Sequence, residues 1–258
     1  MICDLRGILD GWEYEPGKIS VRKIIGRDGR EKVQTRIDLG VLQFELKGRP
    51  DGARPHGYES LLDRHEKHLI AHIEEYGTDA DFVLTPEQCR DLRHEAYLYY
   101  QRYLSLFVLE EFEVVADDTA RNLRAIDFCR RYGASEYDRD VLESQRAYVI
   151  MMNARARATH ALENEAYDAA LSIIKSGIAG IRKAMGASDE GFDADEDRET
   201  EVLHELRDEI LEKMPDETPT KLHWALENAV ACEDFERAAE LRDRLERKSS
   251  PAEGPRPD

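Results

Sequence analysis

The sequence predicts a mainly α-helical protein with a small β-containing unit at its N-terminus. Two observations support this fold class. Apolar and polar residues alternate in the early part of the chain, as in half-buried strands, up to Leu46. From Tyr58 onward, apolar residues recur at the three- and four-residue spacing of helices, and Thr85-Pro86 is a typical helix start.

The N-terminal unit begins with a short predicted helix at 1–12, followed by a strand at 18–25. The Asp-Gly-containing segment 26–29 predicts a hairpin turn. Apolar residues then alternate over 33–39, and the phase of the alternation flips after Gly40. We therefore expect a bulge or bend at Gly40.

This hairpin is basic, because residues 18–36 contain seven Lys or Arg against two acidic residues, a net charge of +5. Such a surface is a candidate site for phosphate or an acidic protein surface. The alternatives are a solvated hairpin face that protects an edge strand from aggregation, and a contact with the protein's own acidic stretch. The candidate anion-binding residues are Arg22, Lys23, Arg27, Arg30 and Lys32.

The first long helix is predicted at 58–77, and its expected core face is Leu62, Leu69, Ile73 and Tyr76. His65, His68 and His72 flank that face, and histidines four residues apart can bind zinc. Solvated histidines beside a core face are the commoner outcome, so we expect no metal. The next helix carries four tyrosines, which favour either packing between helices or a peptide groove: Tyr97, Tyr99, Tyr100 and Tyr103.

An internal echo follows. Residues 112–115 align with 167–170 at an offset of 55, and a third version lies at 235–239. In each version an aromatic residue follows a polar turn and opens a helix. We expect this aromatic to fill the junction of a helical hairpin.

The second version resembles a tetratricopeptide repeat through Ala158, Ala161, Tyr167, Ala170, Ile174, Gly177 and Ile178. The resemblance covers roughly 86–185, and the first version departs from it at Tyr103 and Asn122. It implies stacked helix pairs with a groove for a peptide or helix, and an ordinary array of helical hairpins is the alternative.

Fourteen acidic residues crowd 189–217. The first part, 188–197, reads as a solvated linker, and 199–214 has the spacing of a helix. Residues 249–258 are rich in proline and too polar to form a core, so a disordered tail is expected.

The run Asp-Phe-Glu-Arg-Ala-Ala-Glu-Leu-Arg-Asp at 234–243 closely resembles the UVR motif. That motif occurs in bacterial excinuclease subunits B and C, in Clp-type ATPases and in their adaptors. The resemblance covers 222–248 and implies an interaction motif built as a coiled-coil-like helical hairpin. No phosphate-binding loop or paired zinc-binding cysteines accompany it, so no activity carries over.

Two facing apolar stripes are predicted in this hairpin, and helices of about ten residues bury too little area to be stable alone. The stripes therefore require a partner, either another UVR hairpin or this protein's own repeats. A terminal cap on the helical array is the alternative. The candidate partner-binding residues are Leu222, Leu226, Ala229, Phe235, Ala238, Leu241 and Arg242.

Composition and the absence of known motifs disfavour several classes of function. The formal net charge of −18 disfavours a general nucleic-acid-coating protein. No apolar run is long enough for a membrane helix, no signal peptide is visible, and the four cysteines are scattered, which indicates a reduced cytoplasmic protein. No catalytic, metal or cofactor motif is recognised.

The sequence therefore predicts a non-enzymatic adaptor that docks another protein, which could itself carry a UVR motif, through the hairpin and a helical groove. The runner-up is a nucleic-acid-linked accessory of a repair-type complex, acting through the basic hairpin. An enzyme with an unfamiliar site comes third. The predicted segments are an N-terminal unit at 1–56, a helical array at 57–186, an acidic linker and helix at 187–221, the UVR hairpin at 222–248 and a tail at 249–258.

Overall fold

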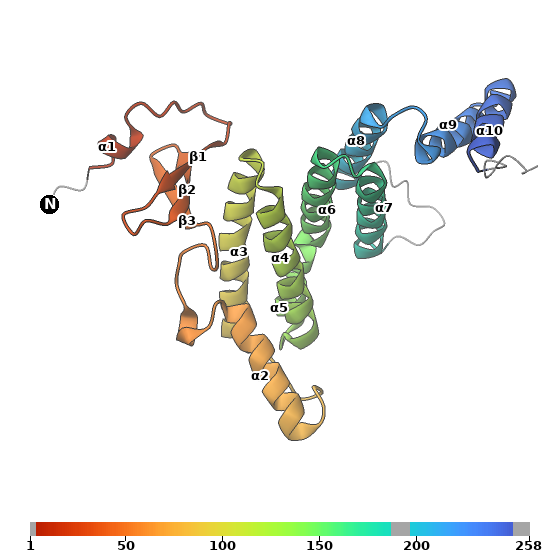
Figure 1. The fold of residues 1–258 in the computed structure, drawn as a ribbon. Helices are drawn as coiled ribbons and strands as arrows, with labels where there is room; N and C mark the ends of the chain where they lie inside the picture. The colour runs from red at the N-terminus through yellow and green to blue at the C-terminus, as the bar shows by residue number, and fades with distance from the viewer. Residues whose placement is uncertain (1–3, 187–196, 250–258) are drawn as a thin grey trace, which may run out of the picture.

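The computed structural model describes residues 4–186 and 197–249. A three-stranded sheet lies at one end of the molecule and a helical hairpin at the other, with paired helices between them (Figure 1). The predicted mainly α-helical fold class is confirmed. The long helices are α2 (Leu61–Tyr76), α3 (Pro86–Val108), α4 (Phe112–Tyr132), α6 (Arg146–Glu163), α7 (Tyr167–Ala184), α8 (Arg198–Lys213), α9 (Pro219–Ala231) and α10 (Phe235–Ser249).

The sheet is antiparallel with strand order β1-β2-β3 (Ser20–Ile25, Glu31–Ile37 and Gly40–Glu45), preceded by the short helix α1 (Arg6–Leu9). Ile37 pairs with Gly40, so Asp38 and Leu39 form a tight turn, and Leu39 is 91% exposed. The expected bulge or bend at Gly40 is therefore corrected: the ladder has no bulge at Gly40, and the chain turns at the two residues before it. The flip in phase marks a second hairpin, because a two-residue turn restarts the alternation on a new strand.

One face of the sheet packs against α3. Val33 and Phe44 are buried in the same core cluster as Tyr103 and Leu106 of α3. A buried hydrogen bond of 2.6 Å also joins the hydroxyls of Thr35 and Ser105. The N-terminal unit is thus continuous with the helical core.

Buried charges join α2, α3 and α4. Glu95 of α3 is fully buried and accepts hydrogen bonds from the backbone N–H groups of Leu61 and Leu62, at 2.8 and 3.2 Å. Its carboxylate also pairs with Arg121 of α4, and Arg49 Nε lies 3.2 Å away. A side chain of α3 therefore fixes the N-terminus of α2, where a negative charge is favourable.

A second buried pair lies further along the same helices. Arg102 donates to both carboxylate oxygens of Asp118, at 2.8 and 2.6 Å. The same guanidinium donates to the carbonyl oxygens of Glu45 and Gly48, at 2.9 and 2.7 Å. Burial raises the pKa of the Asp118 carboxyl, while the bonds from Arg102 act in the opposite direction.

Helix α2 differs from the sequence-based prediction. Leu62 is buried and Leu69 is partly buried, as expected, but Ile73 and Tyr76 are 40% and 62% exposed. The C-terminal end of α2 extends past the end of α3 (Figure 1), which leaves Ile73 and Tyr76 exposed. His65 is buried instead, at 2% exposure, so it is not a solvated flanking residue.

Helices α4, α6, α7 and α8 pack in succession around the main core. Helix α8 contributes Leu203, Leu206 and Ile210 to that core, so it belongs with the array rather than with a solvated segment. The predicted linker, apart from Asp197, and the predicted tail, apart from Ser249, lie outside the described residues. Asp197 caps α8 by accepting a hydrogen bond of 2.7 Å from the backbone of Thr200.

Within 4–186 and 197–249, no helix has the combined length and hydrophobicity needed to span a lipid bilayer.

Gly177 of α7 lies where this helix closely approaches α6 and α8. A Cβ at this position would lie 2.6 Å from the Cβ of Ala154 and 3.1 Å from Cδ1 of Leu203. We expect Gly177→Ala to lower the free energy of unfolding by about 1–3 kcal/mol, although alanine favours the helix by about 1 kcal/mol. Gly180→Ala is the matched control, since its nearest contact is the Ile150 side chain at 3.3 Å. Equal unfolding midpoints for the two variants in urea would contradict the close packing.

His65 predicts a pH dependence. Burial, with smaller contributions from Arg64 and His68, lowers its pKa from 6.5 to about 4. The unfolded chain therefore takes up the proton first, so this contribution is complete above about pH 6.5 and is lost as the pH falls toward 4. The expected loss is up to about 3 kcal/mol. In urea unfolding at several pH values, the free energy of unfolding should depend less steeply on pH in His65→Leu than in wild type between about pH 6.5 and 4.

Candidate functional site

Three helical hairpins among the described residues share one turn. In α3–α4, α6–α7 and α9–α10, a glutamate takes the left-handed conformation with φ near 60°: Glu110, Glu165 and Glu233. The next residue donates its N–H to the carbonyl five positions earlier, at 3.0, 2.9 and 2.8 Å. This is the Schellman pattern of helix termination. The internal echo found in the sequence therefore corresponds to a repeated backbone turn, and the tetratricopeptide resemblance itself stays a prediction.

The aromatic residue after each turn has a different environment. Phe112 is 6% exposed and lies in one cleft with Arg155 and Leu162 of α6. Tyr167 is partly buried and borders the same cleft beside Leu206 of α8. Phe235 is 68% exposed. The expectation that Phe235 fills the hairpin junction is therefore wrong, because no helix follows α10 to cover it within the described chain.

The UVR hairpin has a core of its own. Leu222, Ala229, Ala238 and Leu241 are at most 8% exposed, and Ala225, Leu226 and Leu245 pack against them. The small side chains of Ala229 and Ala238 let the two helices approach, so the facing stripes cover each other more fully than expected. Of the seven candidate partner-binding residues, Phe235 and Arg242 remain exposed, and Val230 beside the turn is 52% exposed.

A short connection, residues 214–218, holds this hairpin to α8. Lys221 donates to the Met214 carbonyl at 2.7 Å and pairs with Asp216 at 2.8 Å. Lys248 and Arg244 of α10 pair with Glu217, and these hydrogen bonds lower the pKa of its carboxyl. One hydrogen bond of 2.5 Å joins Thr220 of α9 to Asp168 of α7. The hairpin therefore has a defined position without sharing the main core.

The basic hairpin uses most of its charges internally. Arg22 stacks on Trp12, with 3.9 Å between its Cζ and the ring centroid, and donates to Gln34. Lys23 pairs with Glu111 at the start of α4. Arg30 and Lys32 pair with Asp28 and Glu45, and hydrogen bonds from Lys32 and Arg30 hold the pKa of Asp28 well below its usual range. Of the five candidate anion-binding residues, Arg27 alone has no such partner among the described residues.

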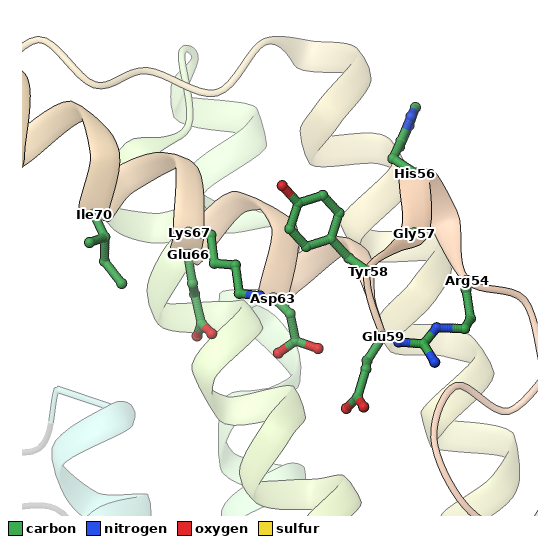
Figure 2. A pocket seen from close by; sticks show the side chains of 9 residues that line it. All are labelled: Arg54, His56, Gly57, Tyr58, Glu59, Asp63, Glu66, Lys67 and Ile70. Carbon is green, nitrogen blue, oxygen red and sulfur yellow. The ribbon is translucent and has the colours of Figure 1, made fainter.

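Figure 2 shows a cavity of about 650 Å³ at the start of α2. Lys67 lies with its ammonium 5.2 Å from the centroid of the Tyr58 ring, and His56 points away from the cavity. Arg54 and Lys67 face Glu59, Asp63 and Glu66 around it. The charges compensate one another, so the cavity favours no class of ligand.

Three of the four tyrosines of α3 line a second cavity, of about 370 Å³. The rings of Tyr97 and Tyr100 stack, and Tyr103 meets Tyr100 edge-on at 5.5 Å between centroids. Tyr99 faces the other way, toward the guanidinium groups of Arg102 and Arg121. Both proposed roles of these tyrosines, packing and lining a groove, thus have a structural counterpart.

The three histidines of α2 do not converge. His65 is buried, His68 meets it edge-on, and His72 packs against Phe82. In the part of the chain that the structure describes, no three His, Cys, Asp or Glu side chains are placed to hold a metal ion.

Comparison with known proteins gives one finding. The family described as UvrB/uvrC motif matches residues 225–250, which agrees with the hairpin that the sequence indicated at 222–248. No curated protein and no solved structure matches the chain. The chain therefore carries a UVR motif near its C-terminus, on the hairpin of α9 and α10.

Proposed function

We propose that this protein is a non-enzymatic adaptor that docks a partner protein through the turn end of its UVR hairpin. The observation that carries the proposal is the 68% exposure of Phe235. Of the equivalent aromatic residues, Phe112 is buried and Tyr167 is partly buried, each beside a following helix of the array. An exposed phenylalanine in a repeated structural position is a natural place for a partner to pack.

The chemistry of this end of the hairpin suits a protein interface. Val230 and Phe235 flank the turn formed by Glu233 and Asp234, so two exposed apolar side chains stand beside two carboxylates. Exposed aromatic residues with a polar rim are typical of transient protein interfaces. The hairpin keeps its own core, so a partner can bind there without unfolding it.

The nucleic-acid-linked alternative has less support. Four of its five candidate cations have partners within the protein, and breaking those pairs would reduce any gain from phosphate binding. What remains in its favour is the occurrence of the UVR motif in UvrB and UvrC proteins.

Phe235→Ser tests the docking surface. Because the ring is exposed, we expect the melting temperature to stay within about 3 °C of wild type. A partner recovered by affinity capture with the wild-type chain should be lost. Tyr137→Ser is the matched control, since Tyr137 of α5 (Glu136–Asp140) is equally exposed at 68%. Recovery of the same proteins by both variants would reject the turn end as the docking surface.

Deleting residues 215–258 separates docking from capping. The hairpin core shares no buried residue with the main core, so the remaining chain should melt within about 3 °C of wild type while losing the partner. Differential scanning calorimetry with size-exclusion chromatography measures both stability and aggregation. A truncated chain that melts much earlier and aggregates would identify the hairpin as a structural cap.

A further inference from the structure

A groove of about 950 Å³ lies between α7, α8 and α9. Apolar side chains from all three helices line it, among them Leu171 and Ile178 of α7, Leu211 of α8 and the partly buried Trp224 of α9. Along α7 the lining extends from Leu171 to Lys183 and beyond, which corresponds to about 18 Å of helix. This length would hold three turns of a second helix.

Three exposed cations of α7 border the same groove. Lys175, Arg182 and Lys183 are exposed, and none of them has a carboxylate within ion-pair distance among residues 4–186 and 197–249. Arg207 adds a fourth cation, paired with its neighbour Asp208 at 2.8 Å. In a chain with a net charge of −18, cations that have no ion-pair partner in the described part of the chain, beside an apolar groove, require an explanation.

Favourable charges at a helix end explain only part of this pattern. Arg182 and Lys183 lie in the last turn of α7, where positive charge complements the helix dipole. Lys175 lies about two turns earlier, beyond the reach of that effect, yet it borders the same groove. All three cations line the groove, whereas only two of them lie at the end of the helix.

We infer that this groove binds an acidic amphipathic helix of a partner protein. Its apolar side chains pack on the partly exposed Leu171 and Trp224, beside the buried Ile178, and its carboxylates pair with Lys175, Arg182 and Lys183. This combination is the helix-in-groove mode of recognition, with apolar anchors for affinity and charges for selectivity. The inference rests on the proposed adaptor function, because it states the chemistry of a segment that such an adaptor would hold.

Charge complementarity favours a peptide over a nucleic acid. The net charge of −18 repels a polyanion over its whole length, whereas a short helix feels mainly the local cations. The apolar lining offers a nucleic acid backbone nothing to bind. Binding to single-stranded nucleic acid is therefore the competing outcome of the test.

Trp224 provides the measurement. The chain contains two tryptophans, so a full-length Trp12→Phe variant reports on Trp224 fluorescence alone. The probe is a synthetic helical peptide about four turns long, with leucines along one face and glutamates beside them. We expect a saturable fluorescence change that weakens at high salt.

A charge-reversal pair gives the control. Lys175→Glu with Arg182→Glu and Lys183→Glu should weaken peptide binding at least tenfold. Arg27→Glu with Lys47→Glu and Arg157→Glu makes the same change in net charge at exposed sites outside the groove, and should bind like wild type. Equal weakening in the two triple variants would overturn the inference, as would tighter binding of single-stranded DNA than of the peptide.

Two further comparisons keep the result decisive. A peptide with serine in place of leucine should bind at least tenfold more weakly, and equal binding would reject the apolar contacts. A chain with Asp189, Glu190, Asp193, Asp195 and Glu196 changed to amides removes competition from the acidic sequence that follows α7. If neither this chain nor the parent binds the peptide, the inference fails. That failure leaves the docking role of Phe235 standing, because the Phe235→Ser test involves no groove residue.

Discussion

Two buried ion pairs between α3 and α4 position the N-terminal third of the molecule. Removing charges from water is costly, so buried carboxylates are retained where several donors satisfy them. Glu95 binds Arg121 and two backbone N–H groups at the start of α2. Arg102 binds Asp118 and the carbonyls of Glu45, at the end of β3, and Gly48. Loss of one partner from such a pair typically costs about 3–5 kcal/mol. The sheet and α2 are therefore attached through polar contacts of specific geometry as well as through apolar packing.

The C-terminal part follows another constraint, which is that each helical hairpin needs a neighbour to cover the aromatic residue after its turn. The α3–α4 hairpin has α6, and the α6–α7 hairpin has α8. The UVR hairpin repeats the turn but has no successor among the described residues, which leaves Phe235 open. Stacked repeats end in such a face unless a polar cap replaces it. An uncovered aromatic side chain would make the hairpin a poor terminal cap, and it makes the hairpin a suitable docking element.

Local features were predictable from the sequence and long-range ones were not. The Asp-Gly turn, the Thr85 helix start and the repeated turns all depend on residues close in sequence, and all were found. The Lys23–Glu111 pair joins residues 88 positions apart, so the basic hairpin appeared more open to anions than it is. Periodicity also assigned Ile73 to the core face of α2 and Phe235 to a hairpin junction, but both side chains are exposed. It could not show whether a neighbouring element covers those faces.

The two proposed binding surfaces share helix α9. Trp224 lines the groove, and Val230 lies at the other end of the same helix beside the turn. The hairpin is held to α7 and α8 by few bonds, among them Thr220 to Asp168 and Lys221 to the Met214 carbonyl. A helix seated in the groove would contact α7, α8 and α9 together and so fix the angle between array and hairpin. Occupation of the groove would therefore place a partner segment on the same helix that leads into the exposed turn before Phe235.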